Sequence, residues 1–153
     1  MVGDTQTAAL IGDDGSIDWM CAPRFDSAAC FAALLGDEDH GRWLIAPAAG
    51  GRAARRRYRD HTLVLETEFD TPEGSVRIID FMPIRDKTVD MIRIVEGLHG
   101  HVPMQMHLTI RFDYGSIIPW VRNVHGALVG IAGPDALVLR TPVETRGAGH
   151  STV

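Results

Sequence analysis

Carboxylate side chains are the residues of this sequence whose chemistry is the most versatile. Two carboxyl groups on either side of a glycosidic bond can hydrolyse it, one as the acid and the other as the base or nucleophile. Asp13 and Asp14 lie in a turn, where aspartate is common because it accepts hydrogen bonds from nearby backbone N–H groups. No spacing identifies an acid–base pair among the candidates, which are Asp13, Asp14, Asp18, Asp26, Glu66, Glu68, Asp80, Glu96 and Asp113.

The surroundings of these carboxylates differ along the chain. Glu66 and Glu68 fall on one face of a predicted strand, and we expect both to be solvated. Asp18, Asp80 and Asp113 stand beside aromatic residues, which favours burial.

The stretch DGSIDWMCAPRFDS (14–27) gathers aromatic, basic and acidic side chains into a few positions. Tryptophan and tyrosine rings stack on sugar rings, and arginine and aspartate bind hydroxyl groups, but the same residue types are enriched where protein surfaces meet. Two interpretations therefore stay open, the rim of a sugar site or an interface with another domain. The candidate residues for either are Trp19, Arg24, Phe25 and Asp26. Companion segments are RFDYG (111–115) and PWVR (119–122).

No motif predicts a metal or a cofactor, and we expect none. His99 and His101 have no third ligand nearby in the sequence, so a turn with two exposed imidazoles is the better interpretation. Cys21 and Cys30 are too few for a disulfide framework and lack metal-ligand spacing. We expect two reduced thiols and a cytoplasmic protein, because the N-terminus carries no secretory signal.

The basic run RAARRRYR (52–59) is the segment that suggests nucleic acid binding. The whole chain, however, has a formal net charge of −5, which argues against nucleic acid and anionic membranes as partners. We therefore expect a charged edge strand, because arginines along an edge discourage pairing with another sheet. No run approaches the ~18 apolar residues of a membrane-spanning helix.

Short apolar runs separated by turn residues predict strands along most of the chain. The runs 7–11 and 16–21 flank GDDG, and the runs 62–70 and 75–82 flank TPEG, in which Pro72 presets a turn. Further strands are predicted over 90–98, 103–113, 119–124, 127–132 and 136–141. Residues 48–57 are predicted to be a loop.

The run 103–113 alternates most clearly between apolar and polar residues. This period of two is typical of a strand with one buried and one wet face. The predicted buried face consists of Met104, Met106, Leu108, Ile110 and Phe112. Because no long helical pattern separates the strands, the 153 residues predict one all-β, antiparallel sandwich.

One short helix is predicted around 27–35. Ser27 is a suitable N-cap, Phe31, Leu34 and Leu35 share a helical face, and Gly36 would end the helix.

Five blocks, in this order, carry a resemblance to a known family: GDTQTAALIGDDGSIDWMCAPRFDSAACFAALLGDEDHGRW, YRDHTLVLETEFDTPEGSVRIIDFMP, IRIVEGLHGHVPM, IRFDYGSIIPWV and GPDALVLRTPVE. They resemble the N-terminal (trehalase-like) segment of bacterial glycoside hydrolase family 15 proteins, the glucoamylase and trehalase group. The resemblance covers nearly the whole chain, and agreement of several blocks in one order is a specific signal.

The resemblance implies a β-sandwich of the super-sandwich type that precedes an (α/α)6-barrel catalytic domain. In that family two glutamates of the barrel hydrolyse α-glucosidic bonds with inversion. No residue here matches the catalytic motifs, so the resemblance assigns no catalytic residue. We therefore expect a domain that is inactive alone and packs against the barrel of the same parent hydrolase. Contact with the α-glucoside substrate at the rim is a further expectation, which rests on the position and type of the residues in 14–27 and not on the resemblance.

Two other functions stay open, an independent carbohydrate-binding module and a structural or oligomerising sandwich without a ligand. Relatives of this family continue past TPVE with further strands, so we expect 1–153 to be the N-terminal domain of a longer hydrolase, with the sandwich incomplete at its C-terminal end. An exposed sheet edge would then favour a homo-oligomer. Specificity for trehalose or for starch-like chains is not decided by these residues.

Overall fold

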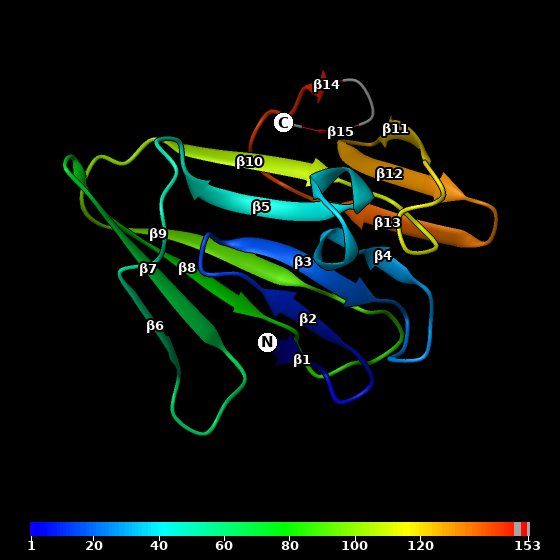
Figure 1. Cartoon of the computed structure of the whole chain (residues 1–153), viewed down its shortest axis with the longest axis horizontal. Helices are drawn as coiled ribbons and strands as arrows, with labels where there is room; N and C mark the ends of the chain where they lie inside the picture. The colour runs from blue at the N-terminus through cyan, green and yellow to red at the C-terminus, as the bar shows by residue number, and fades with distance from the viewer. Residues whose placement is uncertain (149–150, 153) are drawn as a thin grey trace.

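The computed structural model describes residues 1–148 and 151–152, and within them the chain is built almost wholly from antiparallel strands (Figure 1). Two short 3-10 turns, η1 (Ala33–Leu35) and η2 (Glu38–His40), are the helical elements of this part. The strands are β1 (Val2–Gly3), β2 (Ala8–Ile11), β3 (Ser16–Cys21), β4 (Ala29–Phe31), β5 (Arg42–Pro47), β6 (Arg55–Tyr58), β7 (Leu65–Thr71), β8 (Gly74–Phe81), β9 (Ile92–Gly100), β10 (Met104–Thr109), β11 (Trp120–Val124), β12 (Ala127–Ala132), β13 (Asp135–Leu139), β14 (Gly147–Ala148) and β15 (Ser151–Thr152).

The strands form three sheets, and the predicted all-β sandwich is confirmed. The largest sheet has the order β1-β2-β3-β5-β10-β15-β14, with β4 paired to β3. The second sheet has the order β6-β7-β8-β9, and the third has the order β11-β12-β13. Figure 1 shows the first two sheets lying against each other as layers, with the third at the end where β10 leads into β11.

Both hairpins predicted from turn residues are present. β2 pairs with β3 across the Gly12–Gly15 turn, in which the Gly12 N–H donates to the Ser16 carbonyl at 2.8 Å. Gly15 has a φ of +86°, and a Cβ at this position would overlap the Ile45 carbonyl oxygen, so the turn needs glycine for both conformation and space. β7 and β8 pair from Leu65 and Asp80 to Thr71 and Gly74.

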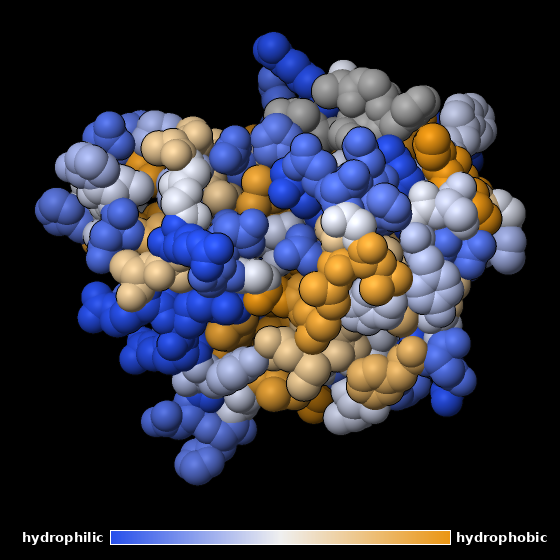
Figure 2. All heavy atoms as spheres, in the orientation of Figure 1, coloured by the Kyte–Doolittle hydropathy of each residue, from blue (hydrophilic) through white to orange (hydrophobic). Residues whose placement is uncertain are grey.

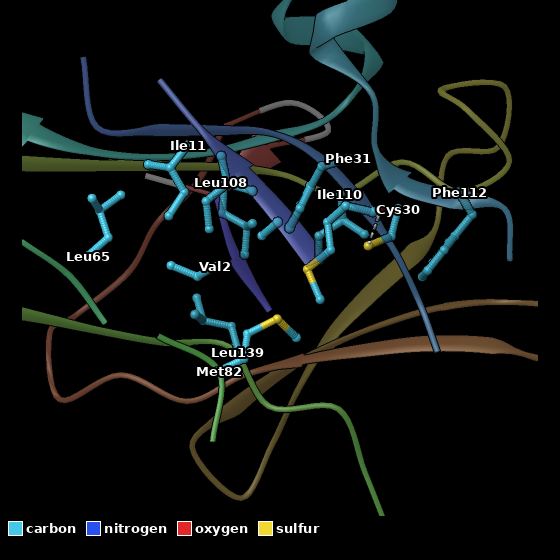
Figure 3. Close-up of a cluster of buried hydrophobic side chains, with 13 residues drawn as sticks. Val2, Ile11, Cys30, Phe31, Leu65, Met82, Leu108, Ile110, Phe112 and Leu139 are labelled. Atoms are coloured by element: carbon cyan, nitrogen blue, oxygen red, sulfur yellow. Dashed lines mark hydrogen bonds between the residues drawn. The ribbon is translucent and has the colours of Figure 1, made fainter. Parts of the chain in front are cut away.

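The main core lies between the layers and joins all three sheets. Its buried side chains point toward one another from strands far apart in the sequence (Figure 3). Leu108 comes from the largest sheet, Leu65 from the second and Leu139 from the third, and each is almost fully buried. Leu108, Ile110 and Phe112 enter this core as predicted, but the wet face expected opposite them is wrong at this end, because Thr109 and Arg111 are buried as well.

A buried ion pair ties the second sheet to the first. The Arg93 Nε of β9 donates to Asp80 Oδ1 of β8 at 2.8 Å, and neither side chain has any exposed surface. The same guanidinium donates across the sandwich to the Gly15 carbonyl at 2.6 Å and lies over the Trp43 ring at 5.2 Å. The expected burial of Asp80 is confirmed, and the cost of burying its charge is offset by this set of bonds.

The helix predicted over 27–35 is wrong. Ala29–Phe31 is strand β4, and only the 3-10 turn η1 follows it. The Ser27 Oγ accepts from the Arg24 N–H at 3.1 Å and so closes a turn instead of capping a helix. All three β4 residues are buried against β3, and this continuous burial favours a strand over an amphipathic helix.

Strands β1, β4, β5, β14 and β15 were not predicted, and β6 was expected only as a charged edge within the basic run. The segment 48–57 is a loop only as far as residue 54, because Arg55 begins β6. β6 lies at the edge of its sheet and all four of its residues are exposed, so the charged edge strand predicted from the basic run is confirmed. In the described part of the chain, no helix is long and apolar enough to span a membrane.

Candidate domain interface

The four residues singled out in the sequence lie at the end of β3 and in the loop 22–28 that follows it. Arg24 Nε donates to Asp26 Oδ1 at 3.0 Å in a solvent-exposed ion pair. This bond from Arg24 lowers the pKa of Asp26 below its ordinary value. Phe25, between them, leaves 63% of its surface in water. Trp19 is half-buried against a small cluster that includes Ala29.

The backbone of the loop 22–28 is anchored by Gln6, near the N-terminus, and by Arg85, which lies between β8 and β9. The Phe25 N–H donates to the Gln6 carbonyl at 2.9 Å, and the Arg85 guanidinium donates to the Pro23 carbonyl at 2.6 Å. Arg85 is in turn fixed by Asp4, whose Oδ2 accepts from Arg85 Nε at 2.7 Å. The backbone that carries the exposed Phe25 side chain is therefore fixed in place.

A second loop, 112–118, approaches the first from the end of β10. Asp113, Tyr114 and Gly115 all have positive φ values, which is unusual for the first two residue types. The turn is closed by the Phe112 and Ile117 backbones, which exchange hydrogen bonds of 2.9 and 3.0 Å. Strained backbone of this kind is concentrated at functional sites.

The turn places Tyr114 beside Trp19. The Tyr114 N–H donates to the Ala29 carbonyl at 3.2 Å, and the ring centroids of Trp19 and Tyr114 are 6.0 Å apart with the planes tilted by 37°. The structure therefore brings the DWMCAPRFD and RFDYG segments together. Their adjacency could not be read from the sequence, because the two aromatic residues are far apart in the chain.

The 3-10 turns add apolar surface next to these loops. Leu34 and Leu35 of η1 are 61% and 64% exposed. η2 is capped by Asp37, and its last residue, His40, lies so close to Gly115 that a Cβ there would collide with the imidazole. Figure 2 shows apolar side chains over η1, in the part of the molecule where Figure 1 places the loops.

We call the surface formed by these three segments the loop face. It combines exposed apolar residues with an exposed ion pair on an anchored backbone. Its members are Trp19, Arg24, Phe25, Asp26, Leu34, Leu35 and Tyr114.

The companion segment PWVR lies in the third sheet. Trp120 of β11 is largely exposed, and the Arg122 guanidinium lies over its ring at 5.4 Å. The pairing buries part of the tryptophan face under a cation.

The expectation that Glu66 and Glu68 are solvated is wrong. They share the outer face of the second sheet as predicted, but the Glu66 side chain is only 3% exposed. It accepts from Arg57 at 2.8 Å and from Arg59 at 2.7 Å, and Arg77 bonds Glu68 at 2.7 Å. The arginines of the basic run cover these carboxylates from the neighbouring strand.

The expected burial of the two other carboxylates beside aromatic residues has different outcomes. Asp18 is half-buried and accepts from the Ser16 hydroxyl at 2.6 Å, whereas Asp113 is exposed, so its expected burial is wrong. The pKa of Asp4 is lowered: burial alone would raise it, but hydrogen bonds from Arg85 and the Thr7 and Gln6 N–H groups outweigh that effect. The pKa of Glu66 is lowered as well, with the hydrogen bond from Arg59 as the largest cause.

The thiols and imidazoles match their predictions. Cys21 and Cys30 are free and buried, and burial raises the pKa of Cys30 to about 12. His99 and His101 are both exposed. Among residues 1–148 and 151–152, no group of three or more His, Cys, Asp or Glu side chains could hold a metal ion.

Comparison with known proteins bears on the origin of this surface. Residues 1–146 match the family model described as trehalase-like, N-terminal. The chain is 37% identical to a trehalase of Mycolicibacterium smegmatis over 132 residues, and this alignment covers 74% of the chain and 20% of that relative. No solved structure matches this chain.

Archaeal proteins are similar as well. Trehalase 1 of Sulfolobus acidocaldarius is 33% identical over 122 residues, which are 80% of this chain and 20% of the relative. A trehalase of Thermoplasma volcanium is 30% identical over 133 residues, and the alignment covers 82% of this chain and 21% of the relative. The chain therefore spans about a fifth of the length of the curated relatives that it matches.

Proposed function

The chain belongs to the trehalase-like N-terminal family, and from this premise we propose that it is the accessory, non-catalytic domain of a trehalase-type glycoside hydrolase. The similar proteins are named trehalases, and the matched region is a small part of each. Catalysis then belongs to the remainder of the parent protein, which we propose to be an (α/α)6 barrel with an inverting pair of glutamates. The free, buried cysteines fit a cytoplasmic location.

The observation that carries the proposal is the loop face. Phe25, Leu34 and Leu35 each expose more than half of their surface on an anchored backbone. Large exposed apolar side chains gathered on one face mark a protein interaction site. We propose that the barrel covers this face, with Phe25 and Leu35 as apolar anchors.

Trp19, Tyr114, Arg24 and Asp26 have a second role in this proposal. Two neighbouring aromatic rings and an ion pair can bind the edge of a sugar as well as a protein surface. We propose that they border the entrance of the substrate pocket in the assembled hydrolase. The substrate that the relatives' names favour is trehalose, with glucoamylase-type chains as the alternative.

The pairing of the buried carboxylates supports a non-catalytic role for this chain. Asp4, Glu66 and Asp80 are its buried carboxylates among the described residues, and each is bound by arginine. An inverting hydrolase needs an acid and a base roughly 6.5–9.5 Å apart on either side of the bond. The three arginine-bound carboxylates instead stabilise the packing of the sandwich.

A chimera tests the proposal. In the M. smegmatis trehalase, the region that matches this chain is replaced by residues 1–146, and hydrolysis of trehalose and maltose is measured. We expect the chimera to hydrolyse trehalose and the isolated 153-residue chain to hydrolyse neither sugar. Turnover by the isolated chain that is lost on substitution of one Asp or Glu would contradict the proposal.

Surface variants test the loop face itself. Phe25→Asp and Leu35→Asp should lower the activity of the chimera by about tenfold or more, because each buries a charge at an apolar contact. Leu63→Asp is the matched control, since Leu63 is exposed to a similar degree but lies between β6 and β7. All three variants should leave the urea midpoint of the isolated chain within its usual error, and equal activity for all three would refute the assignment.

A further inference from the structure

The longest strand of the described molecule lies at an open sheet edge. β9 runs over nine residues and, within the described part of the chain, pairs only with β8. Its backbone groups on the far side therefore have no sheet partner. A long exposed edge strand is a template for pairing with another chain unless its side chains prevent it.

The side chains of β9 do not prevent pairing. Ile92, Ile94, Val95 and Leu98 are all exposed, and Gly97 has open space where a Cβ would be. Its charges are engaged: Arg93 is buried with Asp80, and Glu96 accepts from Arg77 at 3.2 Å. The edge thus offers apolar side chains and free backbone groups with no lysine or proline to block them.

The opposite edge of the same sheet is protected. β6 carries Arg55, Arg56 and Arg57 along its exposed length, and Arg59 follows it directly. A second copy of β6 would bring like charges together, which disfavours pairing at this edge. One open edge and one charged edge permit a closed pair of sheets and oppose a growing fibre.

We propose that β9 is the interface of a homodimer, in which two copies pair antiparallel across a two-fold axis at Ile94. The pairing of β8 with β9 is regular from Ile92 to Gly97 and shifts register beyond that segment, so Ile94 is one of the two residues in the middle of the regular part. Ile94 then faces Ile94 of the second copy, and Ile92 faces Glu96. The two Glu96 carboxylates lie four residues apart along the strand, roughly 14 Å.

This register is the favourable one among the near alternatives. A shift of the axis to Glu96 would place two carboxylates directly opposite each other, which destabilises a cross-strand pair. A shift of one residue in one copy would turn the apolar row to the other face of the sheet. The axis at Ile94 also joins two four-stranded sheets into one, with the arginine-lined β6 strands at its two ends.

Light scattering after size-exclusion chromatography tests the dimer. The 153-residue chain has a mass of 16.7 kDa, and we expect twice this mass at concentrations on the order of 100 µM, which is above the micromolar dissociation constants of weak interfaces. Ile94→Lys should raise the dimer dissociation constant at least tenfold, because it places two ammonium groups on the axis. Val138→Lys, which is equally exposed but lies in the third sheet, should leave the mass unchanged.

Crosslinking tests the register. Ile94→Cys should give a disulfide-linked dimer on mild oxidation, because facing residues on a two-fold axis bring their Cβ atoms within reach. Val138→Cys is the control, and the native thiols are buried. A monomeric chain would overturn the proposal. An Ile94→Cys protein that does not crosslink, although its circular dichroism matches that of the parent, would overturn it as well. The chimera experiment tests Phe25 and Leu35 of the loop face, whereas the dimer experiments test Ile94 of β9. The proposed function and the proposed dimer can therefore be refuted independently.

Discussion

Arg93 joins three parts of the sandwich through one side chain. It bonds Asp80 on the neighbouring strand, lies over Trp43 and donates to the carbonyl of Gly15, in the turn between β2 and β3 of the opposing sheet. A buried ion pair adds little net stability over apolar residues of the same size, but removal of one partner leaves a buried charge without compensation. Arg93 is therefore a residue whose loss the molecule tolerates poorly.

Arg93→Met should destabilise the chain by roughly 3–5 kcal/mol, because Asp80 then stays buried without its partner. The measurement is the urea midpoint. Arg55→Met is the control: Arg55 is paired with Glu68 but mostly exposed, and its loss should cost about 0–1 kcal/mol. The double variant Asp80→Leu with Arg93→Met should recover much of the loss, and a double variant as unstable as the single one would contradict this account.

The burial of Glu66 shows what the residue types alone could not predict. A glutamate that alternates with apolar neighbours is normally solvated. Here Arg57 lies directly opposite Glu66 on β6 and Arg59 reaches the same carboxylate. The sequence shows the basic run and the glutamate separately, but their pairing depends on a strand register that only the fold supplies.

Gly15 sets the turn that joins β2 to β3. Its positive φ and its contact with the Ile45 backbone make two separate demands on this position. Gly126 has a similar φ of +84° but open space around it. Gly126 therefore has only the conformational requirement for glycine, whereas Gly15 has both the conformational and the steric requirement.

Gly126→Ala should cost about 1–2 kcal/mol, which is the usual penalty for a left-handed L-residue. Gly15→Ala should cost clearly more, because the added methyl group must push the β5 backbone away. Thermal unfolding of both variants checks the order. Equal losses would show that the space at Gly15 is less restricted than its neighbours indicate.

The elements that the sequence predicted correctly have alternating side chains and strong turn residues. β7 and β8 flank TPEG, and β10 alternates along its length. β5 (RWLIAP) was missed because four of its six residues are buried in succession, so it shows no alternation. β4 was mistaken for helix because ACFAALL has a helical spacing of apolar residues, and tertiary contact with β3 decided the outcome.

The molecule as a whole uses arginine–carboxylate pairs as its main polar connections. Asp4 with Arg85 ties the N-terminal strands to the segment before β9, and Glu66 connects β7 to β6. Both carboxylates have a lowered pKa in the folded chain. The folded state therefore binds protons less readily than the unfolded chain, in which these groups titrate near pH 4.

Stability should be constant above about pH 5 and should fall as the pH decreases through the lowered pKa values of Asp4 and Glu66. The sign follows from the direction of both shifts, since protonation removes an acceptor that only the folded state uses. Urea unfolding between pH 7 and pH 3 measures this loss. Glu66→Gln should be less stable at pH 7 by about 1–3 kcal/mol and should show a shallower pH dependence, and an unchanged slope would contradict the role of Glu66.

The fold class and the family were predictable because both depend on patterns that extend along the whole chain. The candidate site was predictable only in part. Trp19, Arg24, Phe25 and Asp26 stand in one stretch of sequence, but their neighbour Tyr114 comes from a distant turn and Leu34 and Leu35 were assigned to a helix. Contacts between distant segments require the fold.

The turn at Asp113–Gly115 has a consequence for the proposed contact between the loop face and the catalytic domain. Its backbone is closed by its own hydrogen bonds, and the loop 22–28 is fixed by hydrogen bonds to Gln6 and from Arg85. Little chain entropy remains to be lost when a second body arrives. If the proposed contact forms, this side of it is already preorganised, and the complementarity of the other surface determines its affinity more than any rearrangement of this chain.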